Sequence, residues 1–130
     1  MANPAAEALP LRSAGVNVYC SNVERSHEWY KNVLGLDMNY LPAHNISECA
    51  ERIDPERTLV FFYLCPGLKE WGKSNAVSLC FHAPDLKTKT DALKAAGVKF
   101  ARELSWEEGS DHPSVTILDP DGHGIVIYQA

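Results

Sequence analysis

The 130-residue sequence lacks several features that would point to particular classes of protein. It has no apolar run long enough to span a bilayer. Its 12 basic residues form no cluster and are outnumbered by 17 acidic ones, so neither nucleic acid nor a membrane is an expected partner. Residues 1–12 have neither the basic start nor the continuous apolar stretch of a secretory signal.

Cysteine is sparse and irregularly spaced. The four cysteines, Cys20, Cys49, Cys65 and Cys80, contain no C-x-x-C pair. Without an export signal, we expect them to be reduced thiols in a cytoplasmic protein. The chain does contain an apolar fraction of 45%, which is enough for the core of one structural domain.

The first half of the chain carries a strand signal followed by a helix signal. Residues 14–20 (AGVNVYC) are rich in β-branched and aromatic residues, which predicts a strand. In the next segment Ser21 and Glu24 are spaced as a capping box, and Gly35 stands where a left-handed C-terminal cap belongs. Further strands are expected at 36–41 and 57–65, whereas 43–56 is compatible with either a weak strand or a short helix.

The second half repeats this order with a period of about 60 residues, which is too long for a solenoid. A helix with Leu86, Leu93 and Ala96 on one face and Gly97 as its stop is expected at 84–97. Strands are expected at 76–83, 98–103, 113–118 and 124–129, the last two joined by the Asp-Pro-Asp-Gly turn at 119–122.

This repeat predicts two similar modules within one structural domain. The first module spans 13–65 and the second spans 76–130. Residues 1–12 are expected to form a flexible tail, and the Pro- and Gly-punctuated residues 66–75 a linker.

Three segments together resemble the vicinal oxygen chelate superfamily, which includes glyoxalase, bleomycin-resistance and extradiol-dioxygenase relatives. The segments are VNVYCSNVERSHEWYKNVLGLDM, VSLCFHAPDLKTKTDALKAAGVKF and VTILDPDGHGIVIYQ. The resemblance implies an α+β fold in which two βαβββ modules form a curved mixed sheet around a cavity. It also implies that a homodimer often completes this cavity.

The resemblance assigns metal ligands to four places, and this sequence departs from the pattern at each of them. Three of the positions fall on Gly15, Ser78 and Val126, and the fourth falls on the strand at 57–65, which has no carboxylate on either face. Divalent metals in proteins are held by imidazole, thiolate or carboxylate groups. We therefore expect neither a metal nor another cofactor.

The same resemblance places a set of side chains on the cavity wall, since alternate residues of a strand share one face. The loop at 103–113 is long for a hairpin connection and is expected to act as a lid. The candidate ligand-binding residues are Asn17, Tyr19, Ser78, Cys80, His82, Trp106, Val126 and Tyr128.

Several of these residues have a structural alternative. Cys80 is expected to be a small buried hydrophobe rather than a nucleophile, because no base can be placed beside it. His82 suits a general acid or base, a hydrogen bond to a ligand, or a surface position at a strand end. His27 is expected to pack or to lie on the surface, and His123 is expected to be a turn residue.

Three functions remain open from the sequence. The first is metal-free binding of an apolar or aromatic small molecule, and the second is a metal-independent enzyme that uses the same cavity. The third is a lyase, isomerase or dioxygenase with displaced metal ligands such as His82, Glu107 and His112, which lie at unmatched positions of the two modules.

Overall fold

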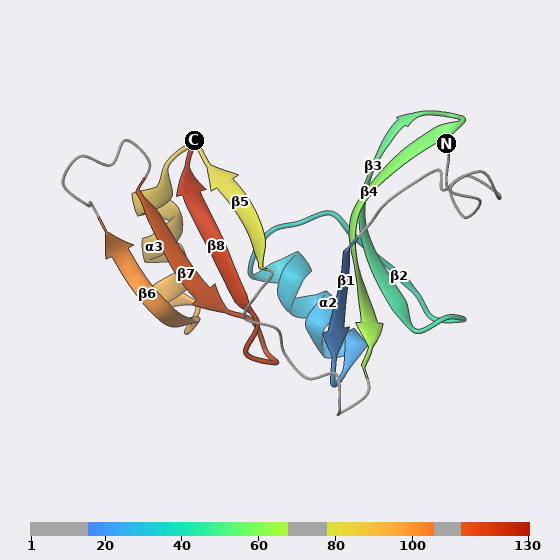
Figure 1. The fold of residues 1–130 in the computed structure, drawn as a ribbon, viewed down its shortest axis with the longest axis horizontal. Coiled ribbons are helices and arrows are strands. Elements are labelled where there is room, and N and C mark those ends of the chain that lie inside the picture. Colours follow the sequence, from blue (N-terminus) through green and yellow to red (C-terminus); the bar gives the residue numbers. More distant parts are fainter. Residues whose placement is uncertain (1–15, 68–77, 106–112) are drawn as a thin grey trace, which may run out of the picture.

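The computed structural model describes residues 16–67, 78–105 and 113–130 (Figure 1). Within these residues it contains two helices and eight strands, which confirms the expected α+β class. The helices are α2 (Val23–Asn32) and α3 (Leu86–Ala95). The strands are β1 (Val16–Cys20), β2 (Met38–Leu41), β3 (Ile46–Asp54), β4 (Arg57–Pro66), β5 (Leu79–Ala83), β6 (Lys99–Ser105), β7 (Ser114–Leu118) and β8 (Gly124–Gln129).

The strands form two four-stranded sheets with the same topology, which confirms the two-module repeat. Their orders are β1-β4-β3-β2 and β5-β8-β7-β6. In each sheet the first and last strands of the module pair in parallel, and the other pairs are antiparallel. No strand pairing joins the two sheets within the described ranges, and Figure 1 shows the edge strands β1 and β5 on either side of the module boundary.

The two helices begin at equivalent cap residues and end before glycine. Asn22 caps α2 by accepting a hydrogen bond from the Arg25 amide at 3.0 Å. The expected capping box at Ser21 is therefore wrong by one residue; both residue types suit an N-cap, and the Ser21 hydroxyl is bonded elsewhere. Gly35 and Gly97 follow the helices with φ of 77° and 80°, as expected for left-handed caps.

Two further expectations are settled by the strands and helices themselves. The ambiguous segment 43–56 contains β3, a nine-residue strand. On α3, Leu86 and Leu93 are buried as expected. Ala96 is exposed, however, because the helix ends at Ala95 and Ala96 forms its C-cap.

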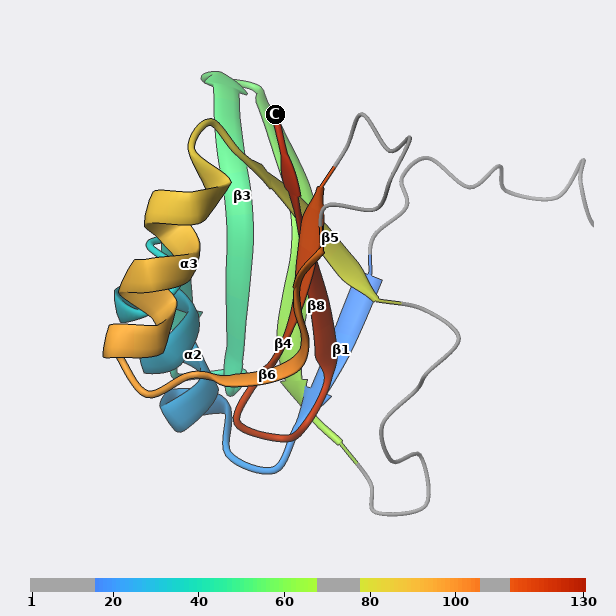
Figure 2. The ribbon, with the colours of Figure 1, turned by 90° about the vertical axis from the view of Figure 1, so that its left-hand side faces the viewer.

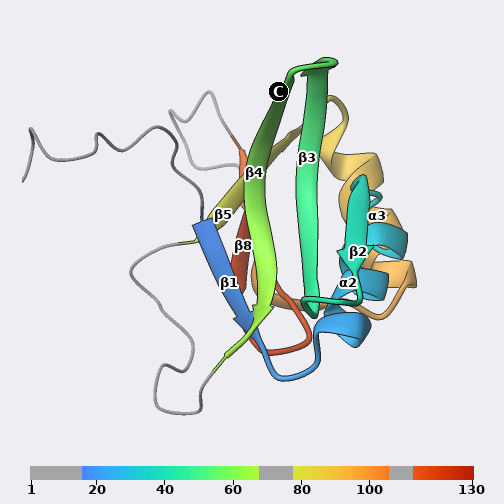
Figure 3. The ribbon, with the colours of Figure 1, turned by 90° about the vertical axis from the view of Figure 1, so that its right-hand side faces the viewer.

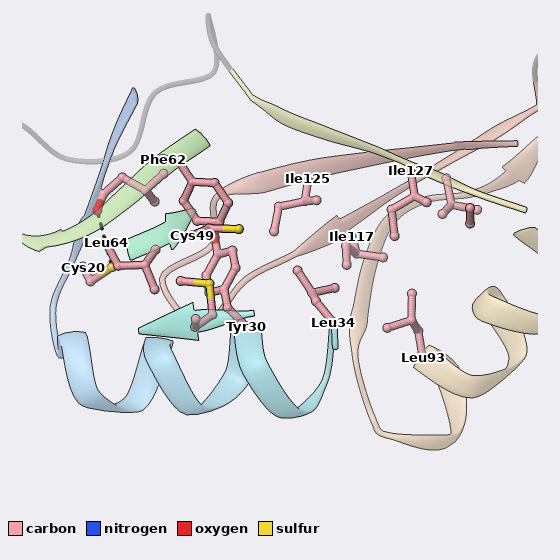
Figure 4. Packing of buried hydrophobic residues seen from close by; sticks show 14 of the residues in the cluster. Cys20, Tyr30, Leu34, Cys49, Phe62, Leu64, Leu93, Ile117, Ile125 and Ile127 are labelled. Carbon is pink, nitrogen blue, oxygen red and sulfur yellow. Dashed lines mark hydrogen bonds between the residues drawn. The ribbon is translucent and has the colours of Figure 1, made fainter. Parts of the chain in front are cut away.

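One hydrophobic core runs beneath both sheets. Figure 4 shows Tyr30 of α2 beside Phe62 of β4, with Ile125 of β8 lying toward the second module. The rings of Tyr30 and Phe62 are 5.6 Å apart, and both side chains are almost fully buried. Leu34 and Leu93 continue the core beneath the second sheet (Figure 4). The modules therefore share apolar contacts, which supports one structural domain.

Both helices lie on the same side of the strands, and the opposite face carries no helix in the described part of the chain (Figures 2 and 3). We call this second face the helix-free face. No helix among the described residues is long and apolar enough to cross a membrane. The tail at 1–12 and most of the linker at 66–75 lie outside the described residues, so the module limits stay a prediction.

Candidate functional site

Burial alternates along the strands that border the module boundary. In β1, Val18 and Cys20 are buried in the core, and in β8, Ile125 and Ile127 are buried. Since successive side chains of a strand point to opposite faces, the residues between them belong to the helix-free face. These residues are Asn17, Tyr19, Val126 and Tyr128, joined by Cys80 and His82 of β5.

Cys80 differs from expectation because its side chain is exposed. The prediction of a buried hydrophobe was wrong, since Cys80 lies on the open face of the edge strand β5. All four cysteines are free, and Cys20 and Cys49 are buried. Burial raises the pKa of Cys20 to about 12, partly opposed by a hydrogen bond with Ser26, so this thiol is unreactive at neutral pH.

The strand registers show which positions of the two modules are equivalent. Each residue of β1 corresponds to the residue of β5 that follows it by 63 positions. Asn17 pairs with Tyr63 of β4, and its counterpart Cys80 pairs with Val126 of β8. Tyr63 therefore stands in the first module where Val126 stands in the second. Sequence reasoning missed Tyr63, because the register of β4 against β1 is not readable from either strand alone.

The residues at these matched positions do not fit a metal ion. Valine has no donor atom, and the hydroxyl groups of Tyr63 and Ser78 are poor ligands compared with imidazole, thiolate or carboxylate. Gly15 lies outside the described residues and has no side chain to offer. In the ranges that the structure describes, no three His, Cys, Asp or Glu side chains gather closely enough to hold a metal.

His82 and Tyr128 form an aromatic pair at the far end of the helix-free face. They lie opposite each other on β5 and β8, and their rings stack with centroids 5.7 Å apart at an angle of 28°. With Gln129 and Ala130 they line an open hollow of about 370 Å³. His82 is exposed, as the surface alternative predicted, and it is also positioned to contact a ligand that lies on Tyr128.

A second hollow, of about 350 Å³, is apolar and lies at the boundary between the modules. It is lined by side chains from both faces of the sheets, including Phe61, Cys80 and Phe81. Phe61 is 48% exposed, which is unusual for a side chain of this size.

A third, smaller cavity of about 90 Å³ lies between the edge of β1 and the strands β5 and β8. It brings together the predicted residues Asn17, Tyr19 and Ser78 with Gly124 and His123. His123 was expected to be a turn residue only. Its Nε2 instead lies 2.7 Å from the backbone carbonyl oxygen of Tyr19, across the module boundary.

The predicted site residues thus share one face but are divided among three hollows. Asn17, Tyr19 and Ser78 line the smallest cavity, Cys80 lines the apolar hollow, and His82 and Tyr128 line the third. Val126 lies between these groups, paired with Cys80. Trp106 and most of the expected lid at 103–113 lie outside the described residues.

The Asp-Pro-Asp-Gly turn explains how the modules are held in this arrangement. Asp121 of the second module accepts hydrogen bonds at the start of α2 in the first module. The Ser21 amide and hydroxyl lie 3.2 and 2.5 Å from Asp121 Oδ1, and the Arg25 guanidinium lies 3.3 Å from it. The negative charge also lies near the positive end of the helix dipole.

Asp119 makes a second, buried connection. Its Oδ2 accepts a hydrogen bond from the Tyr30 hydroxyl at 2.8 Å, and its Oδ1 accepts bonds from the backbone amides of Asp121 and His123. Burial, and secondly the nearby Asp119 carboxylate, raise the pKa of Tyr30 far above its ordinary value, so the phenol stays protonated. The turn therefore holds the second module against α2 of the first and fixes the backbone position of His123.

Comparison with known proteins agrees with this fold. A family model described as the Glyoxalase/Bleomycin resistance protein/Dioxygenase superfamily matches residues 12–127. No curated protein matches the chain by sequence. A hypothetical protein from S. aureus is similar in structure, with a TM-score of 0.69 and 18% identity over 98% of this chain and 100% of that one.

Two further solved structures carry related names. A superfamily member from Sphaerobacter thermophilus has a TM-score of 0.60 and 16% identity, over 92% of this chain and 98% of its own. A glyoxalase I variant from Zea mays has a TM-score of 0.61 and 17% identity, over 92% of this chain and 44% of its own. At such low identity these similarities show the fold alone.

Proposed function

Because the chain belongs to the glyoxalase/bleomycin resistance protein/dioxygenase superfamily, we propose that it binds a flat apolar or aromatic small molecule on the helix-free face, without a metal. One observation carries this proposal. Tyr63 and Val126 occupy the matched positions of the two modules, so neither of these two positions carries a charge; the nearest carboxylate beside them in the strand registers is Glu48, which pairs with Tyr63 and accepts a hydrogen bond from Asn39.

The physical reason is the cost of desolvation. A carboxylate at position 126 would have to be buried by an apolar ligand without a metal or a base to meet it, and such burial is costly. Valine removes that cost. Aromatic rings at Tyr63 and Tyr128 supply faces for offset stacking, each worth about 0.5–1.5 kcal/mol beyond area burial.

A homodimer fits the exposed apolar residues near the module boundary. Val16 on the edge strand β1 is 38% exposed, and Phe61 on the neighbouring strand β4 is 48% exposed. Edge strands with apolar side chains are natural sites of association. We therefore propose a cytoplasmic homodimer in which a second subunit covers part of the helix-free face. Light scattering that finds only a 14.4 kDa species at micromolar concentration would rule out this assembly.

The binding proposal is tested by a thermal-shift screen of planar aromatic compounds, with and without added divalent metals. A ligand that binds only the folded state stabilises it by an amount that grows with the logarithm of its concentration relative to its Kd. We expect hits whose shifts do not depend on metal or on a chelator. Elemental analysis of the purified protein that found about one metal per subunit, with binding lost to a chelator, would refute the metal-free function.

Substitution of Val126 locates the site. Val126→Glu should weaken a hit at least several-fold, because the added carboxylate is buried by the ligand. Val126→Thr is the matched control, since threonine keeps the shape of valine and adds no charge. Equal affinity of the Glu variant and the parent would show that the ligand binds elsewhere.

A further inference from the structure

The hydrogen bond between His123 and Tyr19 identifies which nitrogen of the imidazole carries the proton. A backbone carbonyl oxygen only accepts hydrogen bonds, so Nε2 of His123 must donate. In a neutral imidazole the other ring nitrogen is then an acceptor. The Nδ1 lone pair of His123 is therefore available, and among the described residues it has no hydrogen-bond partner.

The fold itself imposes this tautomer. β1 is an edge strand of its sheet, so every second carbonyl of β1 points to the open side and has no partner within the sheet. The Cys20 carbonyl points toward the chain after β4, where it accepts from the Gly67 amide. The Tyr19 carbonyl is satisfied instead by His123 at 2.7 Å, from a turn that Asp119 orders.

The ring of His123 lines the cavity between the modules. Around it are Asn17, whose amide can both donate and accept, the hydroxyl of Ser78 and the small residue Gly124. The cavity measures about 90 Å³. An apolar cavity of roughly 150 Å³ is known to admit benzene, so this cavity has room for a head group but not for a whole aromatic ring.

We propose that Nδ1 of His123 is the acceptor that binds a hydrogen-bond donor on the ligand, such as the hydroxyl group of a phenol. This donor group of the ligand occupies the cavity between the modules, and the aromatic ring that carries it lies on the helix-free face beside Tyr19. This inference rests on the proposed function and adds a substrate class to it: aromatic molecules that carry a donor group at one edge.

The tautomer is measured first, on the wild-type protein without any ligand. Long-range ¹H–¹⁵N spectra of the imidazole rings distinguish a protonated nitrogen from one with a free lone pair. The His123 signals are assigned by their loss in a His123→Gln variant. We expect a proton on Nε2 and none on Nδ1. A proton on Nδ1 with Nε2 free would overturn the proposal.

Binding is then measured with phenol and with anisole, which has the same ring but no hydroxyl proton. We expect the wild-type protein to bind phenol about fivefold more tightly than anisole, which corresponds to about 1 kcal/mol, the ordinary worth of one hydrogen bond. His123→Gln should abolish this preference. Its side-chain amide can still donate to the Tyr19 carbonyl, so the variant should keep its melting temperature, whereas His123→Phe should lose stability.

The outcomes separate this inference from the function on which it rests. If phenol and anisole bind equally, and both are weakened by Val126→Glu, the binding function stands and the role of His123 is wrong. A preference for phenol that persists in His123→Gln also overturns that role. If neither probe binds at millimolar concentration, both proposals fail.

Discussion

Replacement of Tyr30 by phenylalanine tests whether the Asp-Pro-Asp-Gly turn holds the two modules together. The change removes one oxygen atom and leaves the ring, which packs against Phe62 and Trp29. Tyr30 is 0% exposed and Asp119 is 5% exposed, so water cannot easily replace the lost partner. The remaining two acceptor bonds of Asp119, from the amides of Asp121 and His123, stay in place.

The expected loss follows from the charge and the burial of the pair. A hydrogen bond to a charged group contributes about 1.5–3 kcal/mol, and the loss of one partner of a buried pair falls in the same range. With a urea dependence of about 1.5 kcal/mol/M for a small domain, the unfolding midpoint should fall by roughly 1–2 M. The slope itself should not change.

Urea unfolding followed by tryptophan fluorescence measures this loss, and Tyr40→Phe is the matched control. The Tyr40 hydroxyl donates to Asn45 at 3.1 Å in an exposed setting, so its removal should change the free energy of unfolding by less than about 0.5 kcal/mol. A Tyr30→Phe variant as stable as the Tyr40→Phe variant would refute the idea that Asp119 fastens the modules.

The same bond predicts how stability depends on alkaline pH. The pKa of Tyr30 is raised in the folded state, from an ordinary value of 10.0, first by burial and then by Asp119. A raised pKa contributes stability that is fully present below the unfolded value and is lost as the pH rises above it. Unfolding free energies measured between about pH 8 and pH 11 should therefore decline less steeply in Tyr30→Phe than in the wild-type protein.

Three other substitutions or reagents test separate features. Gly67→Ala should cost about 1–3 kcal/mol in unfolding free energy, because its Cβ would lie 2.5 Å from the Cβ of Tyr19; Gly124→Ala, whose Cβ would lie at an ordinary 3.7 Å from its nearest neighbour, is the control. A thiol reagent should label Cys80 first in the native protein, and any ligand of the helix-free face should slow this labelling. An unchanged rate of labelling in the presence of such ligands would show that they bind elsewhere. The pKa of Asp85 is lowered from 3.8 by its hydrogen bonds to residue 88, so its stabilising effect is present above that value and is lost on acidification; Asp85→Asn should flatten the pH dependence of unfolding between about pH 2 and pH 4.

Local patterns in the sequence were sufficient to predict most of the elements. Helices and strands were placed correctly because their apolar periods, and the glycines at 35 and 97, are properties of short segments. The repeat was visible for the same reason, and it led to the family and the two-module fold. The N-cap was misplaced by one residue because Ser21 and Asn22 are both suitable caps, and only the bond from Ser21 to Asp121 distinguishes them.

The tertiary structure decided what depends on contacts between distant segments. Tyr63 faces Asn17 only through the register of β4 against β1. The exposure of Cys80 follows from the position of β5 at a sheet edge, which its own sequence does not encode. His123 became a candidate binding residue because the second module lies against the Tyr19 carbonyl at the edge of the first sheet, more than 100 residues earlier in the chain. The sequence alone determined the two-module repeat and the lack of metal-binding side chains at positions 78 and 126. The packing of the modules against each other determined the cavity and brought Nε2 of His123 to the Tyr19 carbonyl, because hydrogen bonds at a strand edge depend on what lies beside it.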